Sequence, residues 1–160
     1  MLHTSHHEHG QKQHHYRGLL NMAALSFASM YALMYAMVDA FGNVYNSLNQ
    51  VYMAGLMTAP MIAIELVVMR GMYQDKRRNG LILGGAIVAG VAFFAFIRWQ
   101  TQVTDRQFLR SMIPHHAGAI LMCEQAPIRD PEIKKLCGDI IKGQQAEIDQ
   151  MKAKLRQLNE

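Results

Sequence analysis

The stretch SMIPHHAGAILMC collects several soft metal-binding side chains in one short segment. Met112 precedes the adjacent His115 and His116 by about one helical turn, and Met122 and Cys123 follow them by about two turns. Because a helix advances by about 100° per residue, these side chains share one arc of its surface. Thioether, imidazole and thiolate donors together suit Cu(I), whereas carboxylate-rich clusters suit harder ions. The segment therefore predicts a copper site, although methionine also fills gaps in apolar cores.

Two amphipathic helices must position these groups. The first is expected to begin at Thr104 or Asp105, and the second at Asp130, whose side chain can cap a helix that starts with Pro131. The short connection APIRD predicts that the two helices lie antiparallel, as a hairpin. The second helix carries a stripe at 3-and-4 spacing whose one strongly polar member is Gln144. The stripe consists of Ile133, Cys137, Ile140, Ile141, Gln144, Ile148, Met151, Leu155 and Leu158.

Folding the hairpin about Ile128 predicts two clusters of side chains. Toward its open end, Gln144, Glu147 and Met151 come near the histidines and Met112. Near the turn, Cys123 comes within about one helical turn of the other cysteine, Cys137. In an oxidising compartment the two cysteines favour a disulfide, and binding of a metal by their thiolates is the alternative.

Pro114 interrupts the first helix of the hairpin, because proline lacks an N–H and pushes on the carbonyl four residues earlier. We expect a kink or a restart of the helix there. Such a break would let His115 and His116 turn toward one centre, or it would only bend the helix around its partner.

The segments FLRSMIPHHAGAILM and PEIKKLCGDIIKGQQAEIDQM resemble the DUF305 family over about residues 105–158. The resemblance implies a ferritin-like helical fold and binding of copper or silver outside the cytoplasm. It assigns metal-binding character to four residues and accompanying polar roles to two more: Met112, His115, His116 and Met151, with Gln144 and Glu147. This chain has one hairpin where longer members have a four-helix bundle, and cysteines where alanine is usual.

A hairpin of about 55 residues buries too little surface to be very stable alone. Pairing two hairpins would complete a four-helix bundle. We therefore expect a homodimer or a larger homo-oligomer.

Three apolar runs precede the hairpin, and each is close to the ~20 residues that cross a bilayer. They cover residues 19–38, 51–69 and 81–97. The expected fold is therefore all-α, with three transmembrane helices followed by the hairpin. The expected domains are a His-rich tail at 1–17, a transmembrane domain at 18–100 and the hairpin at 104–160.

Basic residues predict how the chain crosses the membrane. The connection RGMYQDKRRN at 70–79 carries four Lys or Arg residues, whereas the connection at 39–50 carries none. The amino terminus is therefore expected in the cytoplasm and the hairpin outside it, in a bacterial plasma (inner) membrane. These flanks account for most of the net charge of +4, so no nucleic-acid partner is expected.

Two further features have open interpretations. The tail HTSHHEHGQKQHH is either a solvated polar segment or a weak metal-binding tract. In the second membrane run, Met53, Met57, Met61, Glu65 and Met69 recur every four residues. An acid inside a membrane run is a functional candidate, but Glu65 could also extend to the nearby membrane surface.

These features favour a membrane-anchored extracytoplasmic protein that binds Cu(I), and Ag(I) as a second ion, for metal tolerance or delivery. The alternatives are a small metal transporter or transporter accessory and a purely structural oligomerisation module. No enzyme is expected, because nothing resembles a nucleophile triad, a phosphate loop or the repeated Glu-x-x-His of di-iron bundles. The expected partners are a metal ion, membrane lipid and further copies of the chain.

Overall fold

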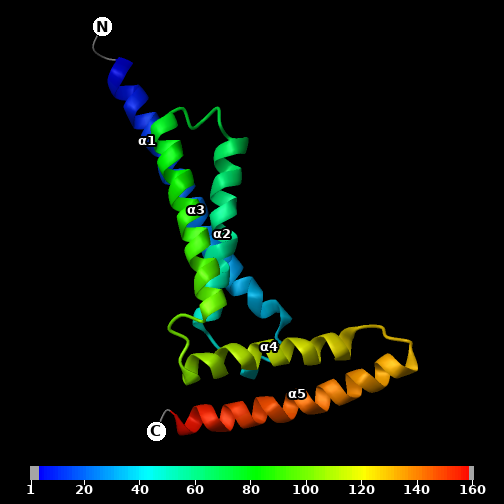
Figure 1. Ribbon diagram of the computed structural model, residues 1–160. Coiled ribbons are helices and arrows are strands. Elements are labelled where there is room, and N and C mark those ends of the chain that lie inside the picture. Colours follow the sequence, from blue (N-terminus) through cyan, green and yellow to red (C-terminus); the bar gives the residue numbers. More distant parts are fainter. Residues whose placement is uncertain (1–3, 159–160) are drawn as a thin grey trace. The chain divides into compact units, whose positions relative to one another are not determined.

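The computed structural model describes the fold of residues 4–158 and the side chains of residues 14–158 (Figure 1). The described chain is all-helical, as predicted. Its elements are α1 (Thr4–Leu33), the 3-10 turns η1 (Met34–Met37) and η2 (Phe41–Asn43), α2 (Leu48–Val68), α3 (Lys76–Trp99), α4 (Asp105–Gln125) and α5 (Pro131–Gln157).

The chain forms two compact units. The anchor unit comprises Met1–Ala32 and Val51–Thr101, and the hairpin unit comprises Leu33–Gln50 and Gln102–Glu160. Three helical stretches are long and apolar enough to cross a membrane: His14–Met37, Leu48–Val68 and Lys76–Trp99. These stretches contain the three apolar runs of the sequence, apart from one residue at the end of each of the first two.

Hydrogen bonds between polar groups link α1, α2 and α3 at one end of the anchor unit. The hydroxyl of Tyr16 in α1 donates to Oδ1 of Asn79 at 2.8 Å, and Nδ2 of Asn79 donates to the carbonyl of Tyr73 at 2.7 Å. Tyr73 in turn donates its hydroxyl hydrogen bond to Oε1 of Glu65 at 3.3 Å. Burial, and then the charge and hydrogen bond of Glu65, raise the pKa of Tyr73. Glu65 therefore has a polar partner near the end of α2.

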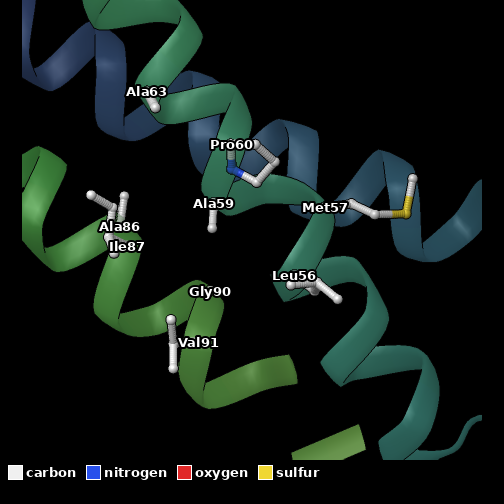
Figure 2. A pocket seen from close by; sticks show the side chains of 9 residues that line it. All are labelled: Leu56, Met57, Ala59, Pro60, Ala63, Ala86, Ile87, Gly90 and Val91. Carbon is white, nitrogen blue, oxygen red and sulfur yellow. The ribbon is translucent and has the colours of Figure 1, made fainter. Parts of the chain in front are cut away.

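Small residues let α2 and α3 approach each other. A Cβ atom on Gly55 would lie 2.5 Å from the ring of Phe93, and one on Gly90 would lie 3.2 Å from Cβ of Ala59. Beside this contact lies an open groove of about 620 Å³ (Figure 2). Its lining is apolar: Leu56, Met57, Ala59, Pro60, Ala63, Ala86, Ile87, Gly90 and Val91.

The hairpin unit is built on α4 and α5, which run antiparallel side by side (Figure 1). Asp130 caps α5 as predicted, since its side chain accepts from the N–H groups of Glu132 and Ile133. The expected restart at Pro114 is wrong, because α4 runs without interruption through this residue. The core of the unit consists of Ile113, Ala117, Ile120, Ile148 and Leu155.

The buried face of α4 is rotated from the predicted one. Ile113, Ala117 and Ile120 are almost fully buried, whereas Phe108 and Met122 are about half exposed. The aliphatic side chains form the core because removing their apolar surface from water gives the largest gain in free energy. The arc of soft donors consequently lies at the edge of the core and extends into solvent.

A third layer covers α4, formed by residues 33–50 (the 33–50 segment). Val38 and Tyr45 of this segment pack against the core of the hairpin unit. The N–H of Leu48 donates to Oε1 of Gln107 at 2.9 Å, in addition to these apolar contacts. Nδ2 of Asn49 donates to Oγ of Ser111 at 3.0 Å. From the sequence, residues 33–38 were expected in the first apolar run and residues 39–50 only as a connection between two membrane helices.

The 33–50 segment and the hairpin share one compact unit, although α2 and α3 separate them along the chain. If α2 and α3 each cross the membrane once, the chain returns to its starting side. The packing within the hairpin unit therefore agrees with a three-span topology.

Cysteine reporters test this topology in a background with Cys123→Ser and Cys137→Ser. Phe41→Cys and Gln150→Cys, at two exposed positions of the hairpin unit, are expected to react with the same impermeant reagent in sealed vesicles. Gln74→Cys, at an exposed position between α2 and α3, is expected to react from the opposite side. Equal labelling of all three positions from one side would contradict three spans.

Gly118 tests the packing of the third layer, because a Cβ atom there would lie 3.3 Å from the carbonyl oxygen of Met37. We expect Gly118→Leu to weaken this packing by about 1–3 kcal/mol through overpacking. Amide hydrogen exchange over residues 36–48 should rise. Gly143→Leu is the matched control, since nothing lies within 4 Å of a Cβ atom there. Equal exchange in the two variants would exclude the close contact.

Candidate metal centre

His116 lies in the middle of α4 and links it to α5. Its ring Nδ1 lies 2.9 Å from the carbonyl oxygen of Met112, one turn earlier in the same helix. Its Nε2 lies 2.7 Å from Oε2 of Glu147 in α5. The side chain of His116 is 11% exposed and that of Glu147 is 56% exposed. The pair therefore joins a buried imidazole to a carboxylate that reaches solvent.

The two contacts determine where the protons of the ring can lie. A carbonyl oxygen only accepts hydrogen bonds, so Nδ1 of His116 carries a proton. An ionised carboxylate also only accepts. Both contacts are therefore hydrogen bonds when the ring is doubly protonated, or when Glu147 donates a proton to a bare Nε2. In either case Nε2 is the ring atom at which a metal ion could take the place of the proton between His116 and Glu147.

Glu147 is the partner of His116 across the hairpin, in line with the predicted proximity of the two side chains, and Nδ1 of His116 is not free for a metal ion. The carbonyl of Met112 occupies that nitrogen. A metal ion could bind this ring only at Nε2, in place of the proton that lies between His116 and Glu147.

The other predicted donors differ in how deeply they are buried and in where they lie on the two helices. His115 is exposed, and the centre of its ring lies 6.0 Å from that of His116. Met112 is half-buried in α4, and Met151 packs against the core from α5. Gln144 is half-buried on α5. Met122 is 54% exposed, nearer the turn of the hairpin.

Among the side chains that the structure describes, no three of the His, Cys, Asp and Glu type form a group that could hold a metal ion. The His116 and Glu147 contact is thus a pair rather than a closed cluster of such residues. Methionine sulfur atoms are the further soft donors nearby in the sequence.

Cys123 and Cys137 form a disulfide between α4 and α5, with their Cα atoms 5.2 Å apart. The sequence analysis favoured this pairing over metal binding by the thiolates. Neither sulfur is a thiolate in this form, so the two cysteines stand apart from a site at His116. Their bond closes the turn end of the hairpin.

The sequence analysis missed the polar groups of the 33–50 segment. Asn43 and Ser47 are buried there, and Nδ2 of Asn43 donates to Oδ1 of Asp39 at 2.7 Å. A signal was present, because Val38, Val44 and Tyr45 make this connection more apolar than a solvated turn requires.

Comparison with known proteins agrees with the resemblance found in the sequence. The model of DUF305, a domain of unknown function, matches residues 86–155. An uncharacterized protein of Acanthamoeba polyphaga mimivirus is 35% identical over 136 residues, which cover 83% of this chain and 88% of that protein. The chain belongs to the DUF305 family. No solved structure matches it.

The DUF305 match begins at residue 86, within α3, and so includes part of the anchor unit as well as α4 and most of α5. The similarity to the viral protein covers still more of the chain. The family match therefore includes the connection between α3 and the hairpin.

The protons on His116 can be tested by ¹⁵N NMR of the histidine rings in the detergent-solubilised chain. We expect Nδ1 to be protonated in the wild type and in Glu147→Gln, because the Met112 carbonyl is unchanged. The Nε2 resonance should shift in Glu147→Gln but not in the control Glu124→Gln, at an exposed position of α4. An unprotonated Nδ1 in the wild type would rule out the contact with Met112.

Proposed function

We propose that this DUF305 chain is a membrane-anchored protein that binds Cu(I), and also Ag(I), on the extracytoplasmic side of a cell membrane. It would hold the ion for tolerance or for delivery to a partner. The ion is cargo here, and the anchor unit keeps the binding unit at the membrane surface.

The observation that carries this proposal is the orientation of the His116 ring. A histidine that binds a metal commonly donates its second N–H to a carbonyl or carboxylate, which fixes the ring and leaves one nitrogen for the ion. Nδ1 of His116 already meets the Met112 carbonyl at 2.9 Å, and Nε2 is directed across to α5. The ring is therefore held in the orientation that a metal ion needs.

The spacing of the neighbouring donors supports a soft ion. Met112 and His116 are four residues apart on α4, and Glu147 and Met151 are four residues apart on α5. Residues at this spacing lie on the same face of a helix. Each helix thus carries one methionine on the face that presents His116 or Glu147. Two thioethers and an imidazole favour Cu(I) over harder ions.

His115 is available as an additional ligand. Two imidazoles that bind one ion through bonds of about 2 Å have ring centres roughly 5–6.5 Å apart. The separation of 6.0 Å between the rings of His115 and His116 falls within this range. An exposed His115 could exchange an ion with solvent or with a partner.

Assembly of two hairpins into a four-helix bundle is the second part of the proposal. Apolar side chains remain exposed toward the turn of the hairpin, where Met122, Ile133 and Leu136 are each about half exposed. Burial of such side chains favours association, and a second copy would supply matching helices.

Copper binding is tested on the full chain with its amino-terminal histidines replaced by Asn and its disulfide intact. Anaerobic titration with Cu(I), in competition with a chelator, should show one bound ion per hairpin. His116→Ala and the double variant Met112→Leu with Met151→Leu should each weaken binding by at least about tenfold, since loss even of an outer-shell partner costs that much. Met122→Leu and Met57→Leu are the matched controls. Equal affinity in all these variants would falsify the proposed site.

A further inference from the structure

The two ends of the hairpin are held together differently. Away from the turn, Ile113, Ile148 and Leu155 are buried in the core. At the turn end, Ile133 is 49% exposed and Leu136 is 57% exposed. The disulfide between Cys123 and Cys137 joins α4 to α5 in this loosely packed part.

The disulfide is placed where a reducing agent can reach it. Both cysteines are half-buried rather than enclosed, and their neighbours Met122 and Leu136 are exposed. A small dithiol can therefore attack one sulfur and then complete the exchange. The protein gains two electrons and two protons as two thiols, and the reductant leaves as its own disulfide.

Reduction should leave the rest of the hairpin unit folded. Ile113, Ile148, Leu155 and the His116 and Glu147 pair lie farther from the turn than either cysteine, and the 33–50 segment packs against this core. These contacts do not involve either cysteine. The thiols would remain facing each other from adjacent helices, since their Cα atoms start only 5.2 Å apart.

We propose that Cys123 and Cys137 form a second, redox-controlled Cu(I) site. Oxidised, the pair is a covalent brace that binds no ion; reduced, it binds one Cu(I) between two thiolates and releases the two thiol protons. Thiolates are among the preferred ligands of Cu(I). The choice of Cu(I) as the ion rests on the proposed function, but the pair of sulfur donors is separate from His116.

This site makes the copper capacity of the chain depend on its redox state. An oxidised chain holds an ion only at His116, and a reduced chain holds one more. A small-molecule disulfide re-oxidises the copper-bound cysteine pair. The two protein sulfurs form a bond with each other, and the small molecule accepts two electrons and two protons to become thiols. Cu(I) is released in this step. Oxidation is thus a release step.

The test uses the full detergent-solubilised chain with its amino-terminal histidines replaced by Asn. Cu(I) is titrated anaerobically into the oxidised and the dithiol-reduced protein, after removal of the reductant. The reduced protein should bind one additional Cu(I), and that ion should protect both thiols from alkylation, as seen by mass spectrometry. Cys123→Ser with Cys137→Ser should lose the additional ion, whereas His116→Ala should keep it.

Three results would overturn the proposal. One is equal stoichiometry in the two redox states, and another is alkylation that bound Cu(I) does not slow. The third is faster amide exchange over residues 113–120 and 148–155 on reduction, which would make the disulfide a structural requirement. If the reduced protein binds one Cu(I) and the oxidised protein binds none, the His116 site is refuted and the cysteine site stands.

Discussion

Burial of one face of α4 is the interaction on which the hairpin unit depends. Ile113 and Ala117 are fully buried because α4 lies between α5 and the 33–50 segment. Two helices alone would leave much of this face in water, and burial of apolar surface is the main favourable term in folding. The segment between the first two membrane helices thereby supplies what a short hairpin lacks. Gly118 permits this layer, since its missing side chain makes room for the backbone at Met37.

The sequence was sufficient for features that depend on composition or on one local signal. Three long apolar runs predicted the three helices that are long and apolar enough to cross a membrane, and Asp130 before Pro131 predicted the start of α5. The face of α4 was not predictable in the same way. Its donors His115 and Met122 and its aliphatic residues Ile113 and Ile120 lie on opposite sides of the helix. Which side is buried depends on the 33–50 segment, which packs from a distant part of the chain.

The candidate site was predicted in part for a related reason. The pairing of His116 with Glu147 follows from the register of two antiparallel helices, which the spacing of residues conveys. The contact of Nδ1 of His116 with the carbonyl of Met112 involves a backbone atom that every residue has. The residue types in the sequence therefore do not predict it. The disulfide could be predicted only in part. The two cysteines indicated it, but the length of the turn did not determine whether their side chains would come close enough to bond.

The order of the elements along the chain has a consequence for synthesis of the protein. The 33–50 segment is made before α2, α3, α4 and α5, and it packs against helices that emerge last. Ribosomes add roughly 5–20 residues per second, so its apolar side chains wait for several seconds without their partners. During that interval Val38 and Tyr45 lack the core of the hairpin unit against which they later pack. The hairpin unit is consequently completed only after α4 and α5 have been synthesised and have met the 33–50 segment.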